Sequence, residues 1–180
     1  METSRMSLRP LTALDAPLLK DLDSDPEVMT YLTNGATSTD EQVAATIERV
    51  LATQAKHQGR FGVWIAHEKA TGQFIGWFLF RPDKATPENT NSIELGYRLK
   101  KAFWRQGLGS EGSRAFLELG FADYKVDEIF AVAMEANIAS QEVMKKVGLK
   151  FVERFDYHEF PAENKSAVRY VLKRSEWKLT

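Results

Sequence analysis

The sequence predicts a mixed α/β fold, in which a mostly antiparallel central sheet of about six to seven strands carries helices on both faces. The first half contains β-rich runs joined by a hairpin-type turn, and the second half contains a strand–helix–strand unit that requires parallel pairing. Amphipathic helical stretches flank these strands. The 180 residues, 43% hydrophobic and 27% charged, suit a single domain over residues 1–180.

The first elements are a short strand and two helices. Residues 6–9 alternate like a strand, and a helix begins after Thr12, where leucines recur at helical spacing. A polar loop is expected next. A second helix then starts at Ser38 or Thr39, which are good N-caps, and stops at the His-Gln-Gly sequence of residues 57–59.

Two β-rich runs follow these helices. Residues 61–67 and 73–81 favour strands, and residues 68–72 have the length and composition of a hairpin turn. The two strands should therefore pair antiparallel. Residues 82–91 carry two prolines, charges and asparagines, so they predict an exposed connection.

The second half contains the βαβ unit. Residues 92–99 predict a strand, residues 110–124 a helix and residues 128–133 a second strand, which a crossover of this length makes parallel to the first. The remaining predicted elements, in chain order, are a helix at residues 137–147 and closing strands at residues 149–155 and 167–172.

Composition excludes several classes of protein. The longest apolar run, residues 74–80, is far shorter than the ~20 residues that span a bilayer, and no signal pattern begins the chain, so we expect a cytoplasmic protein with no membrane partner. The net charge of -1 argues against nucleic acid as a partner.

Cysteine and histidine usage narrows the chemistry further. The chain has no cysteine, which excludes disulfides, a thiolate nucleophile and cysteine metal sites. The three histidines, His57, His67 and His158, lack the spacing of metal ligands. We therefore expect no metal and no covalent catalysis through cysteine.

The most informative segment is Gly-Leu-Gly-Ser-Glu-Gly at residues 107–112. It matches the dinucleotide pattern G-x-G-x-x-G. Glu135 follows 23 residues after Gly112, close to the ~20 residues after which such folds place a ribose-binding carboxylate. However, a seven-residue insert, residues 100–106, separates the preceding strand from Gly107, which is too long for the tight turn of that motif. A dinucleotide-binding oxidoreductase therefore remains only an alternative.

Three groups of residues give this segment its context: 8–11 (Leu-Arg-Pro-Leu) with 25–29 (Asp-Pro-Glu-Val-Met); 93–99 leading to 104–111 (Trp-Arg-Gln-Gly-Leu-Gly-Ser-Glu); and 137–140 (Asn-Ile-Ala-Ser) with 146–149 (Lys-Val-Gly-Leu). In this order and spacing they resemble the GNAT superfamily of acetyl-CoA-dependent N-acetyltransferases, in particular the ribosomal-protein-alanine (RimJ/RimL type) branch. The resemblance covers nearly the whole chain.

The resemblance implies that acetyl-CoA is bound by a strand and a helix N-terminus. Unpaired N–H groups and the helix dipole favour the pyrophosphate, and a bulge near Gly96 would free strand backbone for the pantetheine amides. Trp104 stands where the superfamily usually has Arg or Gln. Glu111, near the start of the helix, is expected to favour the helix dipole or to pair with a free N–H and not to take part in chemistry. The implied cofactor residues are Tyr97, Leu99, Arg105, Gln106, Gly107, Leu108, Gly109, Ser110 and Asn137.

Acetyl transfer requires a neutral amine. A lysine-like amine (pKa ~10.4) needs ~4 kcal/mol to lose its proton at pH 7.4, whereas an α-amine (pKa ~7.7–8.0) needs less than ~1 kcal/mol. Glu94 is the candidate base. The tyrosine that many relatives use as donor to the thiolate falls at Met144. The branch that the chain resembles has a serine at the position of Ser140, so the resemblance implies Ser140 as the donor. The catalytic glutamate of some N-terminal acetyltransferases falls at Val132.

The amine acceptor is left open by the sequence. Tyr31, Trp77 and Tyr157 are candidate walls of its site. A small-molecule amine and a protein N-terminus are both compatible with the sequence as acceptors. The oligomeric state is also open between a monomer and a homodimer. A non-catalytic acyl-CoA sensor is a further alternative, because it would bind the same cofactor without transfer.

Overall fold

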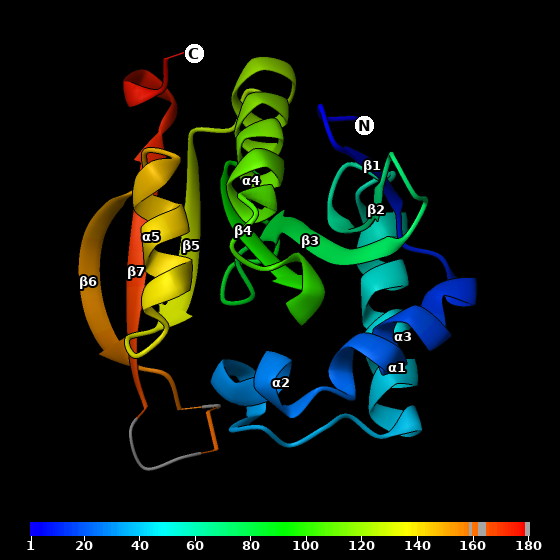
Figure 1. Cartoon of the computed structure of the whole chain (residues 1–180). Coiled ribbons are helices and arrows are strands. Elements are labelled where there is room, and N and C mark those ends of the chain that lie inside the picture. The colour runs from blue at the N-terminus through cyan, green and yellow to red at the C-terminus, as the bar shows by residue number, and fades with distance from the viewer. Residues whose placement is uncertain (159, 162–164, 179–180) are drawn as a thin grey trace.

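The protein folds around one seven-stranded sheet (Figure 1). The structure is a computed structural model, and it describes residues 1–158, 160–161 and 165–178. The strand order is β1-β2-β3-β4-β5-β7-β6, and only β4 and β5 pair in parallel. This confirms the predicted mixed, mostly antiparallel sheet. The strands are β1 (Met6–Pro10), β2 (Gly62–Glu68), β3 (Phe74–Pro82), β4 (Ser92–Leu99), β5 (Glu128–Met134), β6 (Lys150–Asp156) and β7 (Ser166–Lys173).

Helices cover both faces of the sheet. Figure 1 shows α3 beside β2 and α5 beside β5, and α1 and α3 pack together on one face while α4 and α5 pack together on the other. None of the described helices is long and apolar enough to cross a membrane. The α-helices are α1 (Ala16–Asp23), α2 (Pro26–Thr33), α3 (Asp40–Lys56), α4 (Leu108–Glu118), which continues as a π-helical turn over Leu119–Asp123, and α5 (Ile138–Lys146).

Helix α2 corrects the prediction of a polar loop between the first two helices. Asp25 caps it by accepting a hydrogen bond from the Glu27 N–H at 2.9 Å, and Pro26 occupies the first turn, where its missing N–H costs nothing. Asn34 ends the helix with φ 58°. Only eight residues long, α2 is too short to show a clear apolar period.

The parallel pair is short, and this shapes the site. Strand β4 pairs with β5 only over residues 92–94, opposite residues 128–130, after which each strand follows its own half of the sheet. The expected bulge near Gly96 is wrong, because the register of β4 against β3 is continuous from Ile93 to Leu99. The divergence of the two halves, rather than a bulge, opens the gap between β4 and β5.

Candidate active site

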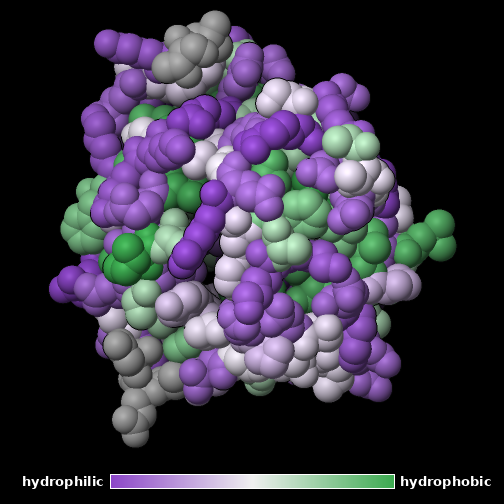
Figure 2. All heavy atoms as spheres, viewed as in Figure 1, coloured by the Kyte–Doolittle hydropathy of each residue, from purple (hydrophilic) through white to green (hydrophobic). Residues whose placement is uncertain are grey.

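A cleft of about 460 Å³ passes through the sheet where β4 and β5 diverge. Figure 2 shows a hollow in the middle of the molecule, between the two halves of the sheet. Register places Glu94 and its cross-strand partners, Arg81 and Phe130, on the face that carries α1 and α3. Tyr97 lies on the face that carries α4 and α5. The cleft therefore has two sides, one on each face of the sheet, and they meet in the gap.

On the α1 side, four cleft residues form a row across four strands. Arg81 of β3 is directly opposite Glu94 of β4, and Glu94 is opposite Phe130 of β5. Arg169 of β7, paired with Val132, lays its guanidinium over the Phe130 ring, with its Cζ 3.8 Å from the ring centroid. The row thus has a cation at each end and a carboxylate and an aromatic ring between them.

Glu94, the candidate base, is held by Arg81. Arg81 donates from Nη2 at 2.7 Å and from Nε at 3.1 Å, and both bonds reach the same carboxylate oxygen, Oε2. Both side chains are about a quarter exposed, at 24% and 23%. Within the described part of the chain, Oε1 of Glu94 accepts no hydrogen bond, so one oxygen is available to an incoming proton donor.

On the α4 side, Tyr97 and Ser140 lie together. Burial raises the pKa of the Tyr97 hydroxyl to about 12, and hydrogen bonding to the Ser140 side chain opposes part of that rise. Tyr97 is therefore a neutral phenol throughout the physiological range. Asn137 caps α5, because its Oδ1 accepts a hydrogen bond from the Ser140 N–H at 3.1 Å. Asn137, Ser140 and Tyr97 all line the cleft.

The backbone of β4 presents free groups to the gap. Lys100 N–H donates to Ile75 O at 2.8 Å, and because antiparallel partners alternate, the N–H and C=O groups of Tyr97 and Leu99 point away from β3. The Leu99 carbonyl is nevertheless taken, since Trp104 Nε1 donates to it at 2.8 Å. Leu99 therefore offers only its N–H, while Tyr97 offers both groups.

The loop before α4 has the shape of an anion site. Arg105 and Gly107 take φ 59° and φ 80°, and α4 begins at Leu108. The first N–H groups of the helix, from Leu108 to Ser110, therefore lack partners within the helix and form the positive end of its dipole. A Cβ on Gly109 would lie 3.0 Å from Cζ of Tyr97, so the helix N-terminus directly adjoins the Tyr97 side of the cleft.

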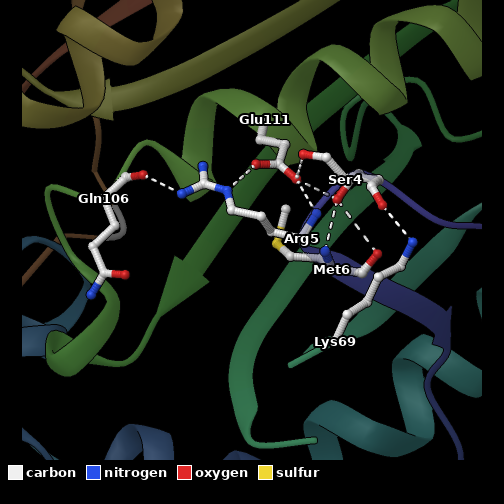
Figure 3. Close-up of polar contacts among 7 residues, drawn as sticks. Ser4, Arg5, Met6, Lys69, Gln106 and Glu111 are labelled. Carbon is white, nitrogen blue, oxygen red and sulfur yellow. Dashed lines mark hydrogen bonds and ion pairs between the residues drawn. The ribbon is translucent and has the colours of Figure 1, made fainter. Parts of the chain in front are cut away.

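Glu111 lies in the first turn of α4, where its charge favours the helix dipole as predicted, but its carboxylate binds the N-terminal segment and not an N–H of its own helix (Figure 3). Its carboxylate accepts from Thr3 Oγ1 at 2.6 Å, Ser4 Oγ at 3.0 Å, Arg5 N at 2.8 Å and Arg5 Nε at 2.7 Å. Burial alone would raise the pKa of Glu111, but these hydrogen bonds lower it to about 2. Arg5 Nη1 also donates to Gln106 O at 2.9 Å, so Arg5 spans the loop from outside.

The predicted residues thus fall into three groups. Glu94, Ser140, Tyr97, Asn137 and the predicted acceptor walls Tyr31, Trp77 and Tyr157 line the through-sheet cleft. Gln106, Gly107 and Ser110 line instead a separate open groove on the outer side of α4. Leu99, Arg105, Leu108 and Gly109 line neither, although Gly109 meets the cleft through Tyr97.

Sequence reasoning missed the two arginines of the row. Arg81 was visible only as the polar end of an apolar strand, and Arg169 as one polar residue in a closing strand. The β3–β4 register could have revealed Arg81, because it stands directly opposite Glu94. Nothing local could have revealed Arg169, which reaches the site through the pairing of β7 with β5.

Comparison with known proteins defines the class. Residues 5–150 match the family described as the acetyltransferase (GNAT) domain. FsC-acetyl coenzyme A-N(2)-transacetylase of Aspergillus fumigatus is 31% identical over 185 residues, covering 98% of this chain and 77% of that protein. The chain therefore belongs to the GNAT family and is an acetyl-CoA-dependent N-acetyltransferase.

Solved structures share the fold. A GNAT-family acetyltransferase from Bacillus anthracis superposes with a TM-score of 0.80 at 20% identity, covering 98% of this chain and 99% of that one. Ribosomal-protein-S5-alanine acetyltransferase from Vibrio fischeri gives a TM-score of 0.78 at 14% identity, with coverage of 99% and 98%. The dinucleotide interpretation gives way to this family, and Glu135 is engaged by Arg154 and Ser166.

Proposed function

We propose that this enzyme transfers the acetyl group of acetyl-CoA directly to the α-amine of a small molecule, with no covalent enzyme intermediate. The observation that carries the proposal is the through-sheet cleft, which brings a carboxylate on one face and a serine–tyrosine pair on the other to the same opening. Acetyl-CoA fits the α4 side, where the free backbone of Tyr97 adjoins the N-terminus of α4.

A small-molecule α-amine is favoured over a protein N-terminus by two observations. The relative from Aspergillus fumigatus is named for transfer to a nitrogen designated N(2). Because acetyl-CoA takes the α4 side, the α1 side is the acceptor side of the cleft. Tyr31 and Leu32 of α2, together with Tyr157, line the cleft there, which favours a compact ligand over an extended chain. The ribosomal-protein branch of the family shares the fold at 14% identity and supplies the alternative acceptor, a protein N-terminus.

Glu94 and Ser140 are the residues to which we assign chemistry. The open oxygen of Glu94 accepts the proton that the amine loses, directly or through a water molecule. On the other side, Ser140 donates a hydrogen bond to the sulfur of coenzyme A while the bond between that sulfur and the acetyl carbon breaks. Tyr97, neutral because burial raises its pKa to about 12, supports Ser140 as a second hydroxyl.

The substitution Glu94→Gln tests this assignment, because it keeps the size of the side chain and removes the proton acceptor. We expect kcat/KM for amine acetylation to fall about 10-fold at pH 7, because only about a tenth of an α-amine of pKa ~8 is neutral there. The loss should shrink above pH ~9, where an α-amine of pKa ~8 is already neutral. The measurement is a pH–rate profile on a panel of primary amines, with products identified by mass.

The matched control is Glu128→Gln, the same substitution one strand away and outside the cleft. It should leave the profile unchanged. An unchanged profile in Glu94→Gln would remove Glu94 from the mechanism. Coenzyme A binding without acetylation of any amine in the panel would make the protein an acyl-CoA sensor instead of an enzyme.

A further inference from the structure

Arg169 is an arginine of the cleft that the mechanism above does not use. It lies on β7, a quarter exposed, and lines the cleft on the acceptor side. Its guanidinium stacks on Phe130, with Cζ 3.8 Å from the ring centroid. Stacking on an aromatic face fixes the plane of the guanidinium and leaves its edge free to donate hydrogen bonds.

Most of those donors have no protein partner. A guanidinium has five N–H groups, and in the described part of the chain Arg169 makes one hydrogen bond, from Nη1 to Asp83 Oδ2 at 3.4 Å. That distance is long for a charge-assisted bond, which is usually ~2.7–2.9 Å. Asp83 is also engaged elsewhere, since its Oδ1 accepts from Ala85 N at 2.9 Å. Arg169 is therefore positioned but largely unsatisfied.

Arg81 differs from Arg169 in this respect. Two of its donors are directed to Glu94, at 2.7 Å and 3.1 Å, so its role is to hold the candidate base. Of the two arginines in the row, Arg169 is the one able to offer a two-pronged contact to a ligand. Such a fork matches the two oxygens of a carboxylate.

The relative position of Arg169 and Glu94 limits the kind of ligand. Glu94 and Phe130 are register partners on neighbouring strands, which lie ~4.8 Å apart, and the Arg169 guanidinium sits over Phe130. Glu94 and Arg169 are thus neighbours in the row, on one face of the cleft. A ligand whose amine and carboxylate are joined through a single carbon atom, with a hydrogen bond at each end, fits between them.

From this juxtaposition we infer that the acceptor is an α-amino carboxylate, whose carboxylate is bound by Arg169 while its amine faces Glu94. The inference rests on the proposed function and names its substrate class. Carboxylate binding at Arg169 also orients the amine toward the gap between β4 and β5, where the acetyl group enters. Arg169 is accordingly a specificity residue and not a catalytic one.

The test compares L-amino acids with their carboxamides as acceptors, in the wild type and in Arg169→Met. The ratio of kcat/KM between the two proteins cancels the different basicities of the two kinds of amine. We expect Arg169→Met to lower kcat/KM about 10- to 100-fold for the amino acids and at most about 3-fold for the carboxamides. Arg169→Lys, which keeps the charge and loses the fork, should fall between.

Arg154→Met is the control, because Arg154 is on the neighbouring strand β6 and outside the cleft. It should leave both kinds of acceptor unaffected. If Arg169→Met does not fold, Arg169→Lys carries the comparison. Equal losses for amino acids and carboxamides would overturn the inference and leave the proposed function standing. Acetylation of neither kind, with coenzyme A bound, would overturn the proposed function itself.

Discussion

Among single residues, the three glycines of residues 107–112 are glycine for two different reasons. Gly107 takes φ 80°, in the left-handed region, where α4 starts. Gly109 lets the helix approach the Tyr97 ring, which lies 3.0 Å from where a Cβ would be. At Gly112 a Cβ would lie 2.1 Å from Cζ of Phe78, so this glycine allows α4 to pack against β3. The motif is therefore one turn glycine and two packing glycines.

Gly112→Ala tests the packing role. Phe78 is fully buried, so the added methyl group forces a rearrangement of the core, and we expect a loss of about 1–3 kcal/mol in the free energy of unfolding. Urea denaturation measures it. Gly96→Ala is the control, because its Cβ would lie 3.8 Å from Leu79, an ordinary contact, and its cost should stay within about 0.5 kcal/mol. Equal costs for the two variants would contradict the packing role.

At the scale of elements, ion pairs attach α1 and α2 to the end of β4. The most buried of them joins Arg98 to Asp23, whose side chains are 17% and 12% exposed. Asp23 also accepts from Ser38 Oγ at 2.8 Å, and Arg98 lies over the Trp77 ring at 4.9 Å. Two exposed pairs, Lys100–Asp21 and Lys101–Glu27, reinforce the attachment. The network positions α2, which carries Tyr31, over the acceptor side of the cleft.

Asp23→Asn should therefore affect one substrate more than the other. With the buried pair weakened, α2 loses its fixed position, and we expect the KM for the amine to rise about 5- to 10-fold while the KM for acetyl-CoA stays within about 2-fold. Steady-state kinetics with each substrate varied in turn measures both. Asp21→Asn, which removes an exposed pair, should change neither. A parallel rise of both KM values would show that α2 has no selective role.

At the scale of the whole molecule, the sheet consists of two halves, β1–β4 and β5–β7. Their strands are joined through only three residue pairs of β4 and β5. The apolar core on the α4 face crosses this junction and holds the halves together, while the cleft lies beyond the last pair. A ligand in the gap contacts both halves at once. Ligand binding should therefore stabilise the fold as a unit.

Coenzyme A should raise the melting temperature of the protein. At a concentration 100 times its Kd, a ligand that binds only the folded state adds ~2.7 kcal/mol, which corresponds to roughly 5–10 °C for a chain of this size. Thermal unfolding with increasing coenzyme A measures the shift. NADH serves as the control and should give none. A shift with NADH equal to that with coenzyme A would revive the dinucleotide interpretation.

Much of this architecture follows from local sequence patterns. The apolar alternation of residues 92–99 and 128–133 and the helix between them predicted the βαβ unit, and capping residues such as Thr39 and Asn137 marked where helices begin. Helix α2 was not predicted, because its eight residues are too few to show a clear apolar period. The bulge at Gly96 was wrongly predicted, because the separation of β4 from β5 arises from the course of two sheet halves and leaves no mark at one residue.

The order of the elements, the family and the residues that can carry chemistry follow from the sequence, because these depend on side-chain type and on near neighbours. What those residues face depends on the tertiary structure. Glu94 meets Arg81 and Phe130 through strand register, Arg169 reaches the cleft from β7, and the Leu99 carbonyl is taken by Trp104. The contacts of Glu94 with Phe130 and of Arg169 with the cleft join strands that only the folded sheet brings together, so no local pattern encodes them.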